Sequence, residues 1–392
     1  MTLLRNGRVV DVRRGLVKET SVAIEGGKII SLGDLKNSEN HSIDLEGAYL
    51  LPGLVNCHVH LGIVFPFNEC DPHESPAVTV LRCLRRGMDA LQAGVTTVRT
   101  VGTAYGADLF LRSMIQKGWV NGPRIVSAGS SISVTGGHGD NLGALLADGP
   151  DEFLKKAREE LVSGANHLKI YITGGISHRE ETFDEPQMSL GEMKAVVSVA
   201  RSKNTYVTAH AGESGPILKA VEAGVRCFEH GYLLGREAAR AVRESRGYLC
   251  PTLVVTRSPN WMRENRFEEW TIQKALEAGN DHLESIRTAI REGVKILNGT
   301  DIPPGDEDEG VNVTVKEMEH YVDAGLSPLE AIQTSSLNGA ELMGIGKQIG
   351  VVEPGTQADL IATRDNPLED IRALRGIFFV MQSGSVIRWD HA

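Results

Sequence analysis

The stretch Leu51-Pro52-Gly53-Leu54-Val55-Asn56-Cys57-His58-Val59-His60 decides how the rest of the chain is interpreted. A short apolar run at 54–56 follows a Pro-Gly turn signal and leads into two histidines separated by one residue. Residues i and i+2 of a β-strand point to the same side, so His58 and His60 would present both imidazoles together at the end of this strand. Histidine is a frequent ligand of zinc and similar divalent ions. A single His-x-His is common by chance, so a metal site needs support from other parts of the chain.

From residue 53 to about residue 345, short apolar runs alternate with longer segments of helical period. The strand-like runs are 54–56, 95–99, 124–128, 167–171, 206–209, 227–228, 248–253 and 295–297, and the helical segments include 81–93, 152–163, 190–202, 215–223, 236–246 and 283–292. Eight strands alternating with helices favour an α/β fold of the (β/α)₈ TIM-barrel type. A doubly wound open sheet shows the same alternation, but it requires a glycine fingerprint after its first strand, and the sequence has none.

The two ends of the chain differ from this central part. They contain short apolar or alternating runs bounded by turn residues, at 3–10, 22–24, 28–32 and 42–45 and again at 350–352, 359–362, 377–381 and 386–389. The ends of one domain often lie close together. We therefore predict a small composite β-sandwich domain from residues 1–52 and 346–392, beside a barrel domain of residues 53–345.

Composition excludes several classes of protein. The 392 residues carry a net charge of −10, which argues against a nucleic-acid or anionic-membrane partner. The sequence has no uninterrupted apolar run near the roughly 18 residues that a spanning helix needs. The five cysteines are scattered and form no Cys-x-x-Cys, so neither a disulfide framework nor a zinc ribbon is indicated. We expect a cytoplasmic protein that acts on a small molecule.

Further polar side chains lie at or near the ends of other predicted strands. His210 and His230 follow the runs that begin at 206 and 227, and Asp301 comes soon after 295–297. Lys169 lies inside the apolar run 167–171, although lysine is rarely fully buried unless it is paired or modified. Barrel enzymes place their sites at the carboxyl ends of the strands. Together with the His-x-His stretch, these residues predict a metal site on that face.

This ordered set resembles the motifs of the amidohydrolase superfamily, whose first motif the opening stretch matches. The closing stretch Gly350-Val351-Val352-Glu353-Pro354-Gly355-Thr356-Gln357-Ala358-Asp359-Leu360 is similar to the superfamily's return into the β-sandwich. Gly136-Gly137-His138-Gly139-Asp140 and Lys169-Ile170-Tyr171-Ile172-Thr173-Gly174-Gly175 look most like the prolidase-like and imidazolonepropionase-related members.

The resemblance implies a binuclear metal centre. Two divalent ions, expected to be zinc, would be bridged by a CO₂-derived carbamate on Lys169. The more buried ion would be held by His58, His60 and Asp301, and the other by His210 and His230. Superfamily membership also implies a homo-oligomer.

The resemblance also implies a mechanism and a substrate class. A metal-bridging hydroxide would attack an amide carbonyl, since two ions lower the pKa of water and polarise the carbonyl. Asp301 would take the hydroxide's proton and deliver it to the leaving nitrogen, while His138 would hold or polarise the carbonyl oxygen. The substrate would be an Xaa-Pro-like dipeptide, an N-acyl amino acid or another peptide-like amide.

Three other functions stay open. A cyclic-amide hydrolase of the imidazolone type would use one metal and an unmodified Lys169. A phosphotriester or lactone hydrolase would use the same centre. A non-catalytic binding protein of this fold would have lost ligand positions, whereas all six candidate positions are filled here.

One position departs from the prolidase-like pattern. That group is expected to have His-Ala-Tyr, with the tyrosine supporting the reacting carbonyl, but this chain has His210-Ala211-Gly212-Glu213. Glu213 or a residue from another loop would then take this role, or the substrate differs. Tyr171 and Arg99, near the ends of their predicted strands, are further candidate substrate contacts. Their alternatives are a layer-filling ring and a rim ion pair, respectively.

Overall fold

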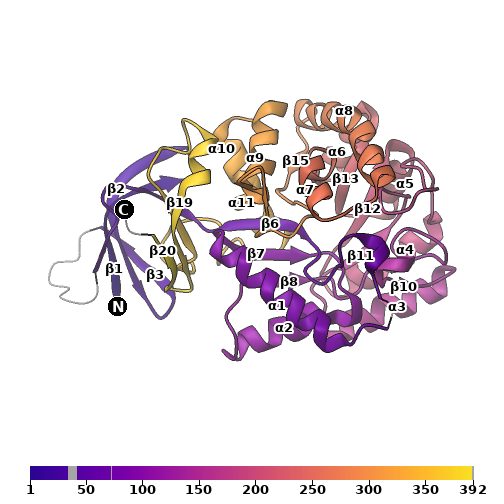
Figure 1. Ribbon diagram of the computed structural model, residues 1–392, viewed down its shortest axis with the longest axis horizontal. Helices are drawn as coiled ribbons and strands as arrows, with labels where there is room; N and C mark the ends of the chain where they lie inside the picture. Colours follow the sequence, from indigo (N-terminus) through magenta and orange to yellow (C-terminus); the bar gives the residue numbers. More distant parts are fainter. Residues whose placement is uncertain (34–41, 72, 391–392) are drawn as a thin grey trace.

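The strand that carries the two histidines belongs to a parallel sheet at the centre of the computed structural model (Figure 1). The structure describes residues 1–33, 42–71 and 73–390. Strands β6 (Leu54–Val59), β7 (Val95–Thr100) and β8 (Arg124–Ser127) pair in parallel, and β6 and β7 are buried at every position. This burial on both faces suits the mostly apolar sequence of β6, whereas the polar positions of β7 are three threonines and Arg99.

A second parallel sheet continues the alternation, in the order β10-β9-β11-β12-β13-β14-β15. Its strands are β9 (Ile132–Ser133), β10 (Leu145–Leu146), β11 (Leu168–Tyr171), β12 (Val207–Glu213), β13 (Cys227–Leu233), β14 (Tyr248–Cys250) and β15 (Lys295–Ile296).

Backbone hydrogen bonds join the two sheets at both sides. The Cys57 amide of β6 donates to the Asn298 carbonyl beyond β15 at 2.7 Å, and the Asn166 amide donates to the Ser127 carbonyl of β8 at 2.7 Å. The strands therefore adopt a TIM-barrel-like arrangement, although their ladders pair as two separate sheets. The predicted α/β architecture is confirmed at this level.

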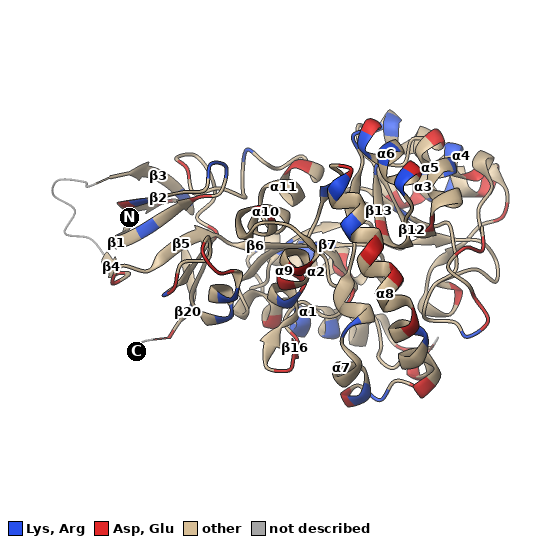
Figure 2. Ribbon diagram, turned by 90° about the horizontal axis from the view of Figure 1, so that it is seen from above, with Lys and Arg blue, Asp and Glu red and all other residues tan. Residues whose placement is uncertain are grey.

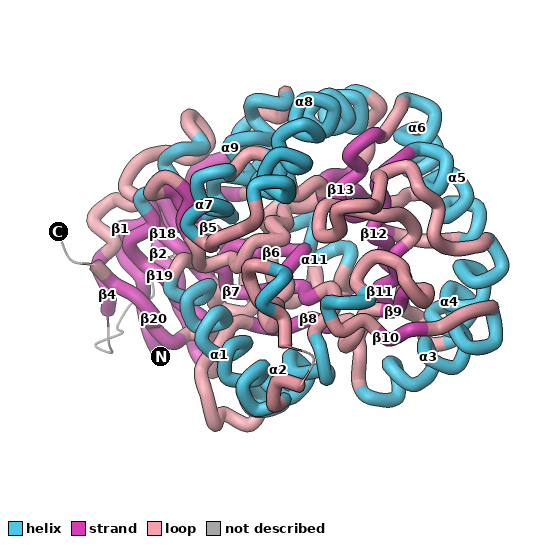
Figure 3. Tube along the Cα trace, turned by 45° about the vertical axis from the view of Figure 1, so that its right-hand side comes forward, coloured by secondary structure: helices cyan, strands magenta, loops and turns pink. Residues whose placement is uncertain are grey.

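Helices cover the outer side of these strands, and Figure 3 shows α3 to α6 and α8 around β11, β12 and β13. The helices are α1 (Pro76–Gln92), α2 (Ala107–Gln116), α3 (Pro150–Ser163), α4 (Leu190–Ser202), α5 (Ser214–Ala223), α6 (Arg236–Glu244), α7 (Pro259–Glu264), α8 (Glu269–Arg291), α9 (Val313–Ala324), α10 (Pro328–Thr334) and α11 (Leu337–Leu342). Helix α4 shows why such segments are helical. Ser189 and Glu192 form a capping box at its start, and Met193, Val196, Val197 and Ala200 bury one face at helical spacing.

Strands from both ends of the chain form one further sheet, in the order β20-β19-β18-β5-β1-β2-β3 with β4 beside β1. In Figure 1 the yellow C-terminal strands lie next to the indigo N-terminal ones. The strands are β1 (Thr2–Asp11), β2 (Leu16–Glu25), β3 (Lys28–Leu32), β4 (Ser42–Asp44), β5 (Tyr49–Pro52), β18 (Leu360–Thr363), β19 (Ile377–Gln382) and β20 (Ser385–Trp389). Strand β5 joins the two sets, because it pairs with β1 on one side and with β18 on the other. The division into a sandwich of two sheets and a separate barrel stays a prediction.

One predicted strand is wrong. Residues 350–352 are irregular, and Gly350 has φ of +89°, which lies in the left-handed region and interrupts an extended run. Val351 and Val352 are buried, so their apolar character reflects packing rather than strand pairing. A small hairpin, β16 (Glu307–Asp308) and β17 (Val311–Asn312), occupies the acidic loop that follows Asp301.

The outer helices carry charges of both signs (Figure 2). Along α3 and α8, basic and acidic side chains are interspersed. Within the described part of the chain, no helix combines the length and apolarity needed to cross a membrane.

Candidate active site

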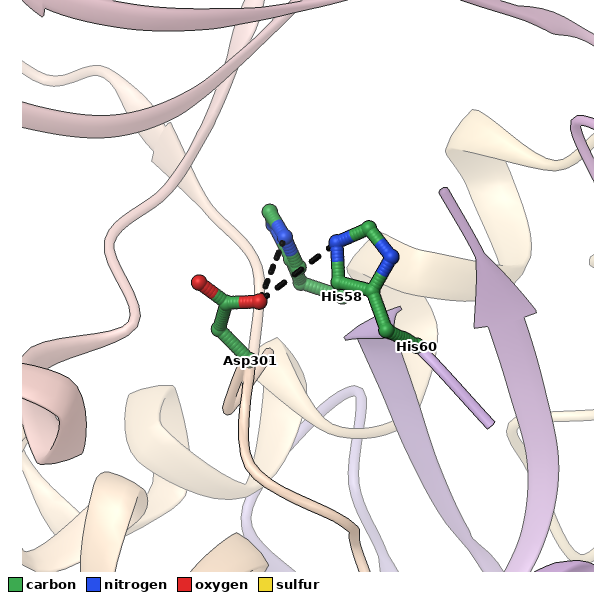
Figure 4. Close-up of side chains that lie close together, drawn as sticks. All are labelled: His58, His60 and Asp301. Carbon is green, nitrogen blue, oxygen red and sulfur yellow. Dashed lines mark ion pairs between the residues drawn. The ribbon is translucent and has the colours of Figure 1, made fainter. Parts of the chain in front are cut away.

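The end of β6 brings His58 and His60 close to Asp301 (Figure 4). The nearest oxygen of Asp301 is 3.3 Å from His58 Nε2 and 3.5 Å from His60 Nε2. Asp301 has φ of +56°, and its amide donates to the His58 carbonyl at 2.9 Å, so the backbone holds the two segments in register. Burial raises the pKa of Asp301, but the neighbouring His58 and His60 outweigh it, and the net pKa lies below the ordinary value.

Each of these histidines is oriented by a partner on its other ring nitrogen. His60 Nδ1 donates to the Gly102 carbonyl at 2.8 Å, which leaves a lone pair on Nε2. Burial lowers the pKa of His60 to about 4, so this ring is neutral at ordinary pH. His58 Nδ1 lies 2.7 Å from Glu229 Oε2. Burial raises the pKa of Glu229, but Arg99 and His58 lower it well below its usual range, so an ionised carboxylate accepts from His58.

Lys169 is in the middle of β11 and is 1% exposed. Its Nζ is buried and has no hydrogen-bond partner among the described residues. Burial lowers the pKa of Lys169, which favours the neutral amine. A neutral amine is the form that combines with CO₂, so this environment fits the predicted carbamate.

His210 of β12 and His230 of β13 complete the set. Their ring centroids are 4.6 Å apart, and the His230 centroid is 4.9 Å from that of His58. His210 Nε2 donates to the Gly174 carbonyl at 3.1 Å, which leaves Nδ1 as an acceptor. His230 Nδ1 contacts the Thr252 hydroxyl at 2.8 Å, and Nε2 has no hydrogen bond to the described residues.

The structure thus brings all six predicted ligands to one cavity of about 400 Å³. His58 Nε2 is buried without a hydrogen-bond partner in the described chain, as is the amine of Lys169. Buried polar atoms normally have partners, so these two atoms mark a place where another group completes the site. Imidazole nitrogens with free lone pairs beside a carboxylate are a donor set that fits divalent metal ions.

His138 and Tyr171 also line the cavity. The His138 ring stacks on His210 with centroids 4.2 Å apart, and its Nδ1 lies 2.6 Å from Glu181 Oε2. Burial raises the pKa of Glu181, but its bond to His138 prevails and holds the pKa at about 2. Tyr171 accepts a hydrogen bond from Ser131 at 3.1 Å, and burial raises its pKa to about 12.

The other two predicted substrate contacts lie elsewhere. Arg99 is fully buried and bonds to Glu229 at 2.7 Å, so it supports His58 from behind rather than lining the cavity. Glu213 accepts from the Gly215 amide at 2.7 Å and caps α5, and it is not among the lining residues either.

Two carboxylates that bond to candidate site histidines were not predicted from the sequence. The sequence did contain an indication of Glu229. Like Lys169, it is a charged residue in a predicted buried strand, and such residues are rarely buried unless they are paired. Glu181 has no such indication, since it lies in the loop between β11 and α4 and meets His138 only through the fold.

The same loop explains why position 212 is glycine. A Cβ at Gly212 would lie 2.3 Å from the Phe183 carbonyl oxygen, so no side chain fits there without moving the backbone of the loop. The tyrosine of the prolidase-like pattern is therefore excluded by the path of residues 177–187.

One wall of the cavity is aromatic. Phe65 and Phe67 come from the loop after β6, and Trp261 and Phe267 come from α7 and the turn beyond it. Their ring centroids are 5.2–5.6 Å apart in the pairs that touch. The Trp261 indole donates to Asp306 at 3.0 Å, which fixes its orientation. Beside the metal-ligand set, the site therefore offers a rigid apolar surface.

A sequence model of the amidohydrolase family matches residues 49–388 of this chain. The chain belongs to the amidohydrolase family. This amidohydrolase is 30% identical to ochratoxinase of Aspergillus niger over 368 residues, which cover 83% of this chain and 72% of that protein. The predicted superfamily and the hydrolase class are confirmed.

Solved structures agree with this assignment. A prolidase in complex with N-methylphosphonate-L-proline is similar with a TM-score of 0.90 and 29% identity, over 99% of this amidohydrolase and 100% of that chain. A Xaa-Pro dipeptidase with bound methionine is similar with a TM-score of 0.89 and 30% identity, over 99% of each chain.

Proposed function

We propose that this amidohydrolase hydrolyses the amide C–N bond of a peptide-like substrate at a centre of two divalent metal ions. The observation that carries the proposal is the gathering of His58, His60, His210, His230 and Asp301 around Lys169, whose buried Nζ has no partner in the described chain.

The proposed ligand sets divide between the two ions. His58, His60 and Asp301 would hold one ion, and His210 and His230 would hold the other. A carbamate on Lys169 would supply further oxygen ligands to the centre. Zinc suits these nitrogen and oxygen ligands. When bound, the ions lower the pKa of a water molecule and polarise the substrate carbonyl.

The protein's own groups then move the proton and hold the carbonyl. The Asp301 carboxylate, kept ionised by its histidine neighbours, accepts a proton from the attacking water and returns it to the leaving nitrogen. His138 gives its Nδ1–H to Glu181, so in its doubly protonated form it donates from Nε2 to the carbonyl oxygen as negative charge develops there.

We propose an Xaa-Pro-like dipeptide, an N-acyl amino acid or a related amide as the substrate. The similarity to a prolidase, a Xaa-Pro dipeptidase and ochratoxinase supports this class. The cavity supports it too, since an aromatic wall suits the apolar part of such a molecule, and polar groups at His138 and Tyr171 suit its amide.

The proposal includes a domain organisation, a partner and a cellular compartment. Residues 53–345 would act as one closed barrel, with residues 1–52 and 346–392 as a composite β-sandwich and a second copy of the chain as partner. The five free cysteines are compatible with a reducing cytoplasm.

Metal analysis and a substrate panel test the proposal. The purified chain is loaded with zinc, manganese or cobalt, its metal content is counted, and dipeptides and N-acyl amino acids are screened with and without a chelator. We expect two ions per chain, amide hydrolysis that the chelator abolishes, and a carbamate on Lys169 in the mass of the intact holoenzyme.

A Lys169→Met variant should lose metal and activity, while Lys155→Met, at a largely exposed position, is the matched control. One ion with a free Lys169 amine would favour the imidazolone-type alternative. Turnover of lactones or phosphotriesters without any amide turnover would favour the other hydrolase class.

A further inference from the structure

Tyr232 is a buried tyrosine in the cavity that the mechanism above does not use. It lies two residues beyond His230 in β13, is 2% exposed, and lines the same cavity as the predicted ligands. Its carbonyl accepts from Ser285, but its hydroxyl makes no hydrogen bond to any residue that the structure describes. A tyrosine that lines a cavity and whose hydroxyl has no partner in the described chain can bind a ligand there.

Packing fixes the Tyr232 ring on several sides. It lies parallel to the His230 ring, with centroids 5.1 Å apart and planes at 2°. Phe183 packs against it at 4.5 Å, and His282 at 4.8 Å. A ring held in this way presents its hydroxyl in a defined position, which is what a preorganised hydrogen-bond donor requires.

The loop that excludes a side chain at Gly212 also supports Tyr232. The Phe183 carbonyl occupies the space next to Gly212, and the Phe183 ring packs on Tyr232. The chain thus lacks a phenol on β12 but has one on the neighbouring strand β13, beside the same loop. Glu213, the other candidate for this role, lies outside the cavity lining.

Tyr232 and His138 lie at the two ends of a series of ring contacts. His138 stacks on His210, His210 contacts His230, and His230 stacks on Tyr232. Two hydrogen-bonding side chains therefore flank the pair of histidines assigned to one ion.

We propose that Tyr232 is a catalytic residue whose hydroxyl donates a hydrogen bond to the oxygen of the reacting amide. The inference rests on the proposed amide hydrolysis and deepens it. No covalent bond to Tyr232 forms, and its proton stays on the phenol throughout.

The test is Tyr232→Phe in the metal-loaded enzyme, because phenylalanine keeps the ring contacts and removes only the hydroxyl. We expect kcat to fall by about 10²-fold with KM nearly unchanged, as for the loss of one donor to a developing oxyanion. An N-phosphonyl analogue of the best substrate should bind more weakly by a similar factor. Metal content and thermal unfolding should match the wild type.

Tyr206→Phe is the matched control. The Tyr206 hydroxyl is buried without a partner in the described chain and its ring stacks on His167 at 5.0 Å, but Tyr206 is not part of the cavity lining. We expect wild-type kcat from this variant.

An unchanged kcat in Tyr232→Phe would overturn the inference. A loss of kcat that comes with loss of metal or of stability would overturn it as well, because Tyr232 would then only support His230. Failure of the proposed function is a different result, namely a metal-loaded wild type that hydrolyses no amide of the panel.

Discussion

At the scale of single residues, the metal-ligand face depends on a buried ion pair behind it. Arg99 and Glu229 are both fully buried, and Glu229 bonds to Arg99 and His58 at 2.7 Å each. A carboxylate behind a ligating histidine fixes its tautomer and raises its basicity. Glu229 and Arg99 therefore contribute to the candidate site by orienting His58.

Replacing Glu229 by Gln should weaken metal binding about 10- to 100-fold, because His58 loses its carboxylate partner. The variant should also be less stable by about 3–5 kcal/mol, since the Arg99 charge is left buried and unpaired. Metal titration and denaturant unfolding measure the two effects. Glu353→Gln, in the half-exposed pair with Arg13, is the control and should change stability by less than about 1 kcal/mol. Wild-type metal affinity in Glu229→Gln would refute the assigned role.

Single residues also show what the sequence could and could not predict. The gathering of the six candidate ligands at one cavity was predictable, because parallel strands carry the side chains at their carboxyl ends to one face. The reason for Gly212 was not predictable, since Phe183 reaches it from a loop whose path no local pattern encodes. The sequence did not identify Glu181 and Tyr232 as candidate site residues for the same reason. Their proposed roles depend on His138 and His230, which only the fold brings next to them.

At the scale of elements, the loop after β6 and helix α7 together build the aromatic wall. Arg266 pairs with Glu69 at 3.0 Å and links the two segments at the surface, while Arg86 lies 5.4 Å from the Phe65 ring centroid. From the order of strands in the sequence, both segments are expected near the site. The contacts between their rings could not be predicted, because they depend on how two loops that are distant in the sequence pack together.

Phe65→Ala should lower kcat/KM for substrates with a bulky apolar group by about 10- to 100-fold, because the variant removes part of the apolar surface. Substrates with only a methyl group should be affected far less. Steady-state kinetics on a matched series measure this ratio. Trp119→Ala, at an exposed position outside the cavity, is the control. Equal losses for large and small substrates would argue against a specificity role.

Helix α9 contributes a buried acid that makes stability depend on pH. Glu317 accepts from the Leu253 and Val254 amides at 2.7 Å each, and burial raises its pKa to about 7. A pKa raised on folding gives stability that is full below the unfolded value of 4.5 and is lost as the pH rises through about 7. Relative to Glu317→Gln, the wild type should therefore lose stability between these pH values. Urea unfolding of both proteins at several pH values across that range measures the difference. If the free energies of unfolding of the two proteins change with pH in the same way, Glu317 does not titrate there.

At the scale of the whole molecule, Asp359 ties the sheet from the chain ends to the barrel-like part. Its carbonyl accepts from the Gly53 amide at 2.8 Å, and its carboxylate accepts from Arg124 at 3.1 Å and from the Ser383 amide at 2.8 Å. The sequence indicated that both ends would meet, but it could not show that one acid contacts three separate segments.

Asp359→Ala should lower the free energy of unfolding by about 1–3 kcal/mol, because the Arg124 guanidinium and the Ser383 amide lose their acceptor. None of the residues in these contacts lines the candidate cavity, so kcat and metal affinity should not change. Thermal unfolding and kinetics together check this. Glu222→Ala is the comparison, since that exposed acid pairs with Lys194 at 2.8 Å on the surface, and its loss should change stability by less than about 1 kcal/mol. Loss of metal in the Asp359→Ala variant would contradict the expectation that these contacts affect stability but not the candidate metal site.

The continuity of β5 with β6 has a consequence for the order in which the enzyme is made. Strand β5 runs through Gly53 directly into the strand that leads to the candidate ligands His58 and His60, and its outer partner β18 begins only at Leu360. Every predicted ligand has been translated before that residue, yet β5 still lacks one of its two neighbours. Ribosome-bound chains that stop short of Leu360 should therefore retain no metal. The candidate site would then be completed only after β18 has left the ribosome.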